Sequence, residues 1–385
     1  MCDDLVPLRD PRTCKEYPIE ILFCDKCCTA HQRFPVPKQE LFPNTYHYRS
    51  RFTADVLSGM AGLVESCSQQ FGSFTDKMVL DIGCNDGSLL DFFRLKGAKT
   101  IGVEPTGAGE DAANKGHTIF SKFLSEDLAS EIVSRHGNPD FITFTNVFAH
   151  IEDLSQVLSS LKRLISTQTV IVIENHYLGS VLDGNQFDTF YHEHPRTYSY
   201  NSFTYIARSL ELDLINVQFP SRYGGNIRVF LGKGSIFTKI GSANIETLTH
   251  RESNFKNQFS ILFSNIQLWR EKKISVITDY VNKYGKLRAK AFPGRAAILV
   301  KLLGLNEDII SAVFEKPGSL KIGHYLPGTR IPILSDDELF LCQDKTLPIL
   351  NLAWHIPNEI RAYMDGNFYI GPVIEILSSD DFIIE

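Results

Sequence analysis

The hydrophobic positions of residues 51–240 form short apolar runs that alternate with amphipathic stretches. The apolar runs predict strands at Met78–Ile82, Thr100–Glu104, Phe141–Thr145 and Thr169–Glu174. Helical periodicity predicts helices at 51–72, Ser88–Lys96, Glu110–Lys115, Asp153–Ile165 and Ser202–Leu210. Alternation of this kind is typical of a parallel, doubly wound sheet, to which Asn226–Leu231 is expected to add an antiparallel strand.

The rest of the chain divides into three further segments. Residues 1–50 are rich in proline and cysteine and form a separate N-terminal segment. Residues 241–288 are polar with helical spacing and predict a helical connector. From residue 289 apolar runs alternate again, which predicts a C-terminal α/β lobe over 289–385. These runs are Ile298–Leu303, Ile309–Phe314, Ile331–Leu334, Leu347–Leu352 and Phe368–Ile376.

Composition narrows the possible partners and the compartment. The formal net charge is 39 − 45 = −6 without a block of basic residues, which argues against a nucleic-acid partner. No apolar run approaches the roughly 20 residues of a membrane span, so we expect no membrane partner. The N-terminus lacks the pattern of a signal peptide, and eight cysteines in 385 residues fit reduced thiols better than a disulfide framework. We therefore expect a cytoplasmic protein.

The turn after the strand Met78–Ile82 has a composition suited to a cofactor. Gly83 and Gly87 let the backbone bend and approach a ligand, and Glu104 ends the next strand, where it would accept from ribose hydroxyls. The Gly-x-Gly-x-x-Gly pattern is absent, and the acids of the turn suit the ammonium end of S-adenosylmethionine (SAM) better than a pyrophosphate. We predict a SAM site, with an ordinary strand-to-helix turn as the alternative. The expected cofactor-binding residues are Asp81, Gly83, Asn85, Asp86, Gly87, Glu104 and Asn146.

The stretch Tyr191-His192-Glu193-His194 sets a phenol, two imidazoles and a carboxylate side by side. Such a set is suited to moving a proton near neutral pH. Two alternatives stay open for its histidines, which could be metal ligands or interior residues without a catalytic role. Asn146 and His150 follow a strand at the open end of the sheet, where they serve either as structural caps or as ligand contacts.

Motifs spread over nearly the whole chain carry a resemblance to a known family. They are Tyr17–Phe23 running into Cys24-x-x-Cys27, Tyr46-His47-Tyr48, the SAM turn, Asn146–His150, Gln186–His194, Tyr223–Val229, Tyr325–Thr329 and Leu352–His355. On these residues the chain resembles the bacterial sugar C-methyltransferases that act on nucleotide-linked 4-keto-6-deoxysugars. The Tyr191–His194 cluster and the final lobe are specific to that family, whereas the SAM turn occurs in other methyltransferases.

The resemblance implies an α/β fold with three parts. These are a class I, Rossmann-like SAM-methyltransferase domain, a small N-terminal lobe with zinc, and a C-terminal α/β lobe that helps to hold the nucleotide sugar. It implies C-methylation next to a ketone, with His194 as the base and Tyr191 and Glu193 organising the sugar and the enol. Tyr46, His150 and Arg228 are the expected substrate-binding residues. Two alternatives are methyl transfer to oxygen or nitrogen of another small molecule, and a binding protein without turnover.

Two features depart from the family pattern. The family's zinc lobe uses two Cys-x-x-Cys pairs, but only Cys24 and Cys27 stand in that pattern here, so zinc binding is uncertain. In the C-terminal lobe, Lys290–Ala297 replaces a turn rich in glycine and alanine, which puts nucleotide contact by this loop in doubt. Trp354 and His355 are expected to serve packing.

Overall fold

The computed structural model describes residues 4–44, 46, 48–237, 245–342 and 344–383, so Cys2 and His47 lie outside the described residues. The chain forms two compact units. The larger unit comprises 20–181 and 193–256, and the smaller unit comprises 1–19, 182–192 and 257–385. These limits differ from the expected boundaries at 50, 240 and 288, and they divide the Tyr191–His194 cluster between the two units.

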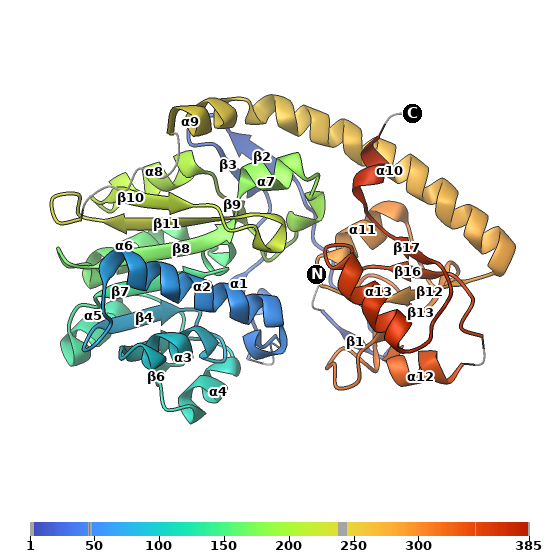
Figure 1. Cartoon of the computed structure of the whole chain (residues 1–385), viewed down its shortest axis with the longest axis horizontal. Coiled ribbons are helices and arrows are strands. Elements are labelled where there is room, and N and C mark those ends of the chain that lie inside the picture. The colour runs from blue at the N-terminus through green and yellow to red at the C-terminus, as the bar shows by residue number, and fades with distance from the viewer. Residues whose placement is uncertain (1–3, 45, 47, 238–244, 343, 384–385) are drawn as a thin grey trace. The chain divides into compact units, whose positions relative to one another are not determined.

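A seven-stranded sheet forms the centre of the larger unit, in the order β10-β11-β8-β7-β4-β5-β6 (Figure 1). Strands β4, β5, β6, β7 and β8 are parallel to one another, whereas β11 is antiparallel to both β8 and β10. The strands are β4 (Met78–Ile82), β5 (Lys99–Val103), β6 (Thr118–Phe120), β7 (Phe141–Thr145), β8 (Val170–His176), β10 (Asp213–Gln218) and β11 (Asn226–Gly232). This confirms the predicted parallel sheet and its antiparallel edge.

Helices connect and cover these strands. They are α1 (Lys38–Leu41), α2 (Ala54–Phe71), α3 (Ser88–Leu95), α4 (Ala108–Asn114), α5 (Glu126–His136), α6 (Leu154–Leu164), α7 (Leu178–Asp183), α8 (Tyr200–Ser209) and α9 (Ile245–Ser253). Ser125, Asp153 and Ser199 cap the first turns of α5, α6 and α8 with side-chain oxygens, which satisfies backbone donors that a helix start leaves unpaired.

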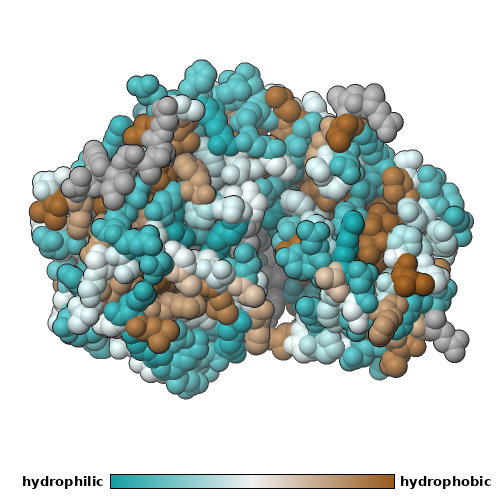
Figure 2. Space-filling model, viewed as in Figure 1, coloured by the Kyte–Doolittle hydropathy of each residue, from teal (hydrophilic) through white to brown (hydrophobic). Residues whose placement is uncertain are grey.

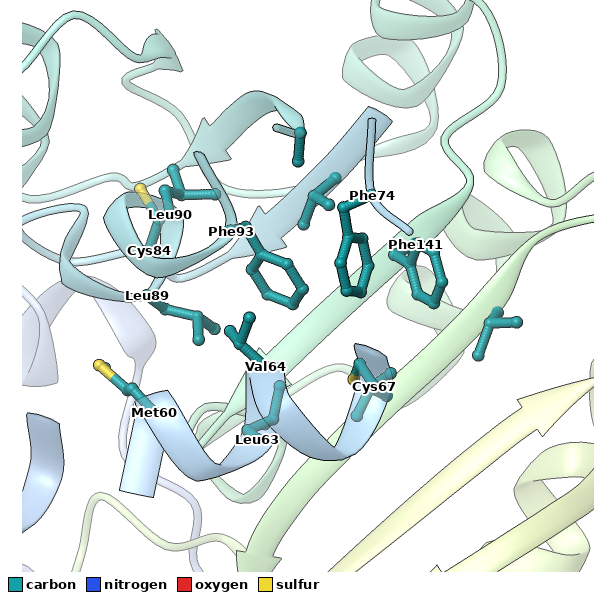
Figure 3. Packing of buried hydrophobic residues seen from close by; sticks show 14 of the residues in the cluster. Met60, Leu63, Val64, Cys67, Phe74, Cys84, Leu89, Leu90, Phe93 and Phe141 are labelled. Atoms are coloured by element: carbon teal, nitrogen blue, oxygen red, sulfur yellow. The ribbon is translucent and has the colours of Figure 1, made fainter. Parts of the chain in front are cut away.

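The core beneath the sheet is made by α2 and α3 (Figure 3). Helix α2 contributes Met60, Leu63, Val64 and Cys67, which recur at the three- and four-residue spacing of one helical face. Opposite them lie Leu89, Leu90 and Phe93 of α3 together with Phe74 and Phe141. Burial of this face holds the start of α3, and with it the turn after β4, against the sheet.

The smaller unit has a second parallel sheet, in the order β15-β13-β12-β16-β17. Its strands are β12 (Leu287–Lys290), β13 (Ile310–Glu315), β15 (Ile333–Ser335), β16 (Ile349–Asn351) and β17 (Val373–Glu375). Its helices are α10 (Phe255–Tyr284), α11 (Ala296–Leu303), α12 (Asp336–Leu341) and α13 (Pro357–Gly366). The chain therefore has the predicted C-terminal α/β lobe. A short pair, β1 (Val6–Pro7) and β14 (His324–Tyr325), joins the first residues to this unit.

A small antiparallel sheet in the larger unit carries the cysteine turn. Strands β2 (Ile21–Cys24) and β3 (Thr29–Gln32) form a hairpin, and β9 (Arg196–Thr197) pairs with β3. The strand β9 follows the Tyr191–His194 cluster directly in sequence, so the hairpin fixes the chain where it leaves that cluster.

The face of the molecule shown in Figure 2 mixes hydrophilic and hydrophobic residues. Scattered apolar side chains of this kind are normal on folded proteins. Within the described ranges, every helix is too short or too polar to cross a lipid bilayer.

Candidate active site

The strand order places a ligand-binding edge at the ends of β4 and β7. Strands β5 and β6 lie on one side of β4, whereas β7 and β8 lie on the other side. The strand order therefore reverses between β4 and β7. Ligands of open α/β sheets bind at the carboxyl ends of the strands at this point. Gly83 lies here with φ 72°, and a Cβ on it would approach the Cγ atoms of Val147 to 2.7 Å. Only glycine fits both the backbone angle and the space.

Buried polar atoms without a partner gather at the same edge. The Thr145 hydroxyl and the Asn146 side-chain oxygen, at the end of β7, are buried and form no hydrogen bond with any of the described residues. Asn146 also has φ 55°, a conformation that is uncommon for residues other than glycine. Buried polar atoms are nearly always paired, so these two are candidates for bonds to a ligand. The ribose and methionine groups of SAM offer suitable donors and acceptors, and the contact of Asn146 with SAM stays a prediction.

Glu104 ties the turn after β4 to the loop after β5. Its carboxylate accepts from the backbone N–H of Asn85 at 3.0 Å, and from the backbone N–H and hydroxyl of Thr106 at 2.9 and 2.7 Å. A carboxylate has about four acceptor positions, so one is left for a ribose hydroxyl. Glu104 is only 5% exposed, and its contact with Asn85 holds the turn after β4, the predicted cofactor turn, in shape.

Residues 48–51 lie against the predicted cofactor turn. The Asn85 side chain accepts from the backbone N–H of Ser50 at 2.9 Å and donates to the carbonyl of Tyr48 at 3.2 Å. The Asp86 carboxylate accepts from the backbone N–H of Arg51 at 3.0 Å. Asn85 and Asp86 thus have a structural role that the sequence did not reveal, in addition to the predicted contact with SAM. Gly87, with φ 75°, forms the left-handed start of α3.

Asp81 lies inside the sheet below this turn. It is 3% exposed and accepts a hydrogen bond of 2.7 Å from the Thr143 hydroxyl on the neighbouring strand. Burial raises the pKa of Asp81 to about 7, although the bond from Thr143 acts in the opposite direction. Asp81 is therefore placed to support the turn from below, and its predicted contact with SAM stays a prediction.

Three histidines come together where β7 and β8 end. The ring of His194 lies 5.0 Å from that of His150 and 5.3 Å from that of His176, measured between centroids. His150 ends a 3₁₀ turn, η2 (Phe148–His150), and stacks on Phe42, whereas His176 is the last residue of β8. Burial lowers the pKa of His150 to about 4, so this ring is neutral at pH 7. His176 was not predicted, because its strand was expected to end at Glu174.

The chain around His194 is fixed by hydrogen bonds within the larger unit. The side-chain amide of Gln32 donates to the backbone carbonyl of His194 at 3.1 Å. The Tyr46 hydroxyl donates to the Glu193 carboxylate at 3.3 Å. Glu193 and His194 are each 5% exposed. The structure thus brings the predicted residues Tyr46, Glu193, His194 and His150 into one part of the larger unit.

Tyr191 and His192 belong to the smaller unit. The His192 ring bonds to the backbone carbonyl of Tyr17 at 2.9 Å, and burial lowers the pKa of His192. His192 therefore has a structural partner at the start of the chain.

Arg228 takes part in a buried ion pair on the central sheet. Its guanidinium donates to the Glu174 carboxylate at 2.7 Å and to the Gln218 side chain at 3.1 Å. Glu174 also accepts from the Asn226 side chain and lies 3.3 Å from Arg222. A substrate contact by Arg228 stays a prediction, and the structure shows that the residue ties β11 to β8.

Two family matches cover most of the chain. Residues 47–217 match a methyltransferase domain, and residues 221–371 match a C-methyltransferase C-terminal domain. The chain belongs to the SAM-dependent C-methyltransferases. A relative, C-methyltransferase NovU of Streptomyces niveus, is 27% identical over 376 residues, which covers 93% of this C-methyltransferase and 87% of NovU.

Solved structures resemble parts of this C-methyltransferase. The PH0226 protein of Pyrococcus horikoshii has a TM-score of 0.40 at 13% identity, covering 51% of this chain and 97% of its own. The SAM-bound magnesium protoporphyrin IX methyltransferase of Synechocystis has a TM-score of 0.35 at 12% identity. The match covers 46% of this chain and 80% of the Synechocystis chain. The family assignment therefore depends on the sequence matches.

The cysteine turn of the C-methyltransferase does not fit a structural zinc ion, which needs four ligands. Throughout the described residues, no group of three or more His, Cys, Asp or Glu is arranged to hold a metal. The turn is held by α8 instead, since the Ser202 hydroxyl contacts the Thr29 hydroxyl at 2.7 Å and the carbonyls of Cys27 and Cys28 at 3.1 and 3.2 Å. Burial raises the pKa of the Cys28 thiol to about 11.

We expect the purified C-methyltransferase to carry less than one zinc ion per chain. The reason is that Cys24 and Cys27 supply two thiols where four ligands are needed. Metal analysis by inductively coupled plasma mass spectrometry checks this on protein prepared without chelators. One zinc ion per chain that survives dialysis against a chelator would show that the prediction is wrong.

Acid should destabilise the C-methyltransferase through His150. Its pKa is about 4 in the folded state against about 6.5 in the unfolded chain, so the unfolded chain binds a proton first as the pH falls. Above about pH 6.5 His150 is neutral in both states and costs the folded state nothing. As the pH falls from 6.5 toward 4, the unfolded chain gains a proton that the folded state does not bind, so the free energy of unfolding decreases. We expect a loss of about 2 kcal/mol, allowing for the remaining exposure of the ring.

The measurement is urea unfolding at pH 7 and pH 4.5 for the parent and for His150→Phe. The variant should lose less stability than the parent between the two values. Asp81, whose pKa is raised, stabilises the folded state at low pH and is common to both proteins, so it cancels in the difference. Equal losses in parent and variant would contradict the assignment, and His250→Phe, at an exposed position, is the control.

Proposed function

We propose that this enzyme methylates a ring carbon next to the ketone of a nucleotide-linked keto-deoxysugar. The observation that carries the proposal is the grouping of His194, His150 and His176 at the same sheet edge as the predicted cofactor turn. The match to a C-methyltransferase C-terminal domain supports transfer to carbon. The sugar and its nucleotide come from the resemblance of the motifs, above all Tyr191–His194.

The chemistry requires a base beside the carbon to be methylated. A C–H bond next to a carbonyl is a weak acid, so proton removal must be assisted and the enolate oxygen must be stabilised as charge develops. His194 takes this proton in the proposed reaction. SAM supplies the electrophilic methyl group when it is bound, and the electron pair left on carbon forms the new carbon–carbon bond. Atoms and charge balance because the sulfonium becomes a neutral thioether and His194 keeps the proton.

The neighbours of His194 suit this role. His150 is neutral at pH 7 because burial lowers its pKa to about 4, so it adds no positive charge that would oppose protonation of His194. Glu193, the residue before His194, accepts a hydrogen bond from the Tyr46 hydroxyl. A carboxylate and a phenol therefore lie next to the segment that carries His194. In the proposal Tyr46 closes over the sugar, and Tyr191 and Glu193 hold the sugar and the enol.

The test uses SAM carrying a ¹³C-labelled methyl group and a panel of nucleotide-linked 4-keto-6-deoxysugars. Products are analysed by two-dimensional NMR, which shows whether the labelled methyl is bonded to carbon, oxygen or nitrogen. We expect a new carbon–carbon bond next to the ketone and no product from the corresponding 4-hydroxy sugars, which cannot form an enolate.

Other outcomes would replace the proposal. A labelled methyl on oxygen or nitrogen would indicate an enzyme that kept the cofactor site but uses His194 to activate another group. SAM binding by calorimetry without a product from any keto sugar would favour a different acceptor or a binding protein.

A further inference from the structure

A buried ion pair lies just before the Tyr191–His194 cluster, within the smaller unit. The Asp188 carboxylate, 0% exposed, sits in a 3₁₀ turn, η3 (Phe187–Thr189). One of its oxygens accepts from Arg295 Nη2 at 2.6 Å, and the other accepts from Arg295 Nε at 2.7 Å. The second oxygen also accepts from the indole N–H of Trp354 at 2.7 Å. The arginine thus binds the carboxylate through two parallel hydrogen bonds, the strongest form of this contact.

The partners of Asp188 come from the carboxyl edge of the second parallel sheet. Arg295 stands at the start of α11, after β12, and Trp354 follows β16, the neighbour of β12. The Arg295 guanidinium also lies 5.2 Å from the centre of the Trp354 ring, which favours a cation–π contact. Arg295 belongs to Lys290–Ala297, the segment that departs from the glycine- and alanine-rich family turn.

The rest of the segment before the cluster is fixed to the same unit. Phe187 packs against Trp269 at 5.0 Å between ring centroids, and Phe190 lies 6.1 Å from Phe259. Both phenylalanines are buried. Asp188 is therefore the charged centre of a buried anchor that ends immediately before Tyr191.

We propose that Arg295, acting through Asp188, is a positioning residue that sets where Tyr191 and His192 stand for the methyl-transfer reaction. Asp188 is three residues from Tyr191, too few to absorb a large displacement. Trp354 supports the same carboxylate and shares the role. Misplacement of a reacting group by about 1 Å can cost on the order of 10²-fold in rate, so the anchor matters without touching substrate. The consequence for turnover rests on the function proposed above.

The test compares Arg295→Lys, Arg295→Met and the control Lys301→Met. Lysine keeps the positive charge but cannot form the two parallel hydrogen bonds of the guanidinium. Methionine loses both the charge and the hydrogen bonds. Lys301 lies on the same helix, α11, in an exposed ion pair with Glu16, so its loss should leave activity unchanged. For each protein we would measure kcat and KM with the accepted sugar, the Kd of SAM and the melting temperature.

Two spectroscopic signals report the anchor without turnover. The chain has two tryptophans, so fluorotryptophan labelling gives two ¹⁹F resonances, and Trp354→Phe assigns the one from Trp354. The ¹³Cε1 resonance of His192, assigned with His192→Gln, follows the segment beyond Asp188. Arg295→Met should shift both resonances and lower kcat by about 10–100-fold, with the Kd of SAM changed by less than about twofold. For Arg295→Lys, the resonance shifts and the loss of kcat should lie between those of the parent and those of Arg295→Met.

Either of two results would overturn the proposal. The first is a kcat in Arg295→Met that equals that of the parent. The second is a loss of kcat, of SAM affinity and of melting temperature together, to the same extent in Arg295→Lys as in Arg295→Met. That result would show a merely structural role. Should Arg295→Met not fold, the double variant Asp188→Asn, Arg295→Met removes both charges and leaves no unpaired one. If the parent accepts no keto sugar, the proposed function fails by itself. The anchor is then decided by the His192 resonance, which must shift clearly more in Arg295→Met than in Lys301→Met, whose partner Glu16 precedes Tyr17.

Discussion

The His194→Ala enzyme is expected to turn over about 10²–10⁴-fold more slowly than the parent, with unchanged affinity for SAM. A positioned base contributes a rate factor of this size, and the His194 ring lies 5.0 Å from that of His150 and 5.3 Å from that of His176. SAM affinity should hold because the cofactor turn is shaped by Glu104 and Asn85. Steady-state kinetics and calorimetry check the two parts.

Exchange of the sugar proton with solvent deuterium identifies the base directly. With SAM replaced by its demethylated product, the parent should exchange the proton next to the ketone, and His194→Ala should not. His250→Ala, which removes an exposed histidine on α9, is the matched control and should behave as the parent. Exchange at the parental rate in His194→Ala would assign the base to another residue.

The central sheet could be predicted from the sequence because its strands are buried on both faces. Strands β4 and β7 match the expected Met78–Ile82 and Phe141–Thr145 residue for residue, since both are short, mostly apolar segments that are buried in the sheet. The strand β12 was not predicted, because it reads Leu-Arg-Ala-Lys. Its Lys290 is buried through an ion pair of 2.9 Å with Asp336, and a partner so distant in sequence leaves no local signal.

The candidate site was predictable in its residue types and only partly in its geometry. Glycines and acids in a strand-to-helix turn predict a cofactor edge by local pattern. The approach of His176 to His194 depends instead on where β8 ends, and the bond from Tyr46 to Glu193 joins distant segments. The assignment of Tyr191 and His192 to one unit and of Glu193 and His194 to the other is a property of the tertiary structure alone.

The Glu104→Ala enzyme is expected to bind SAM more weakly by about 1–3 kcal/mol, the range for a lost hydrogen bond to a charged group. The carboxylate would lose its bond to a ribose hydroxyl. It would also lose the bonds from Asn85 and Thr106 that hold the cofactor turn, so two backbone donors would be left without an acceptor. Calorimetric titration with SAM measures the change.

Two further variants separate these contributions to SAM binding. Glu104→Gln keeps the shape and one acceptor oxygen, so it should lose less affinity than alanine. Glu110→Ala removes an exposed carboxylate on the adjacent helix α4 and should bind SAM as the parent does. If Glu104→Ala bound SAM with parental affinity, Glu104 would have no part in the site, and the edge between β4 and β7 would have to hold the ribose through other residues. The buried Asn146 oxygen, which has no hydrogen-bond partner among the described residues, would then be the first candidate.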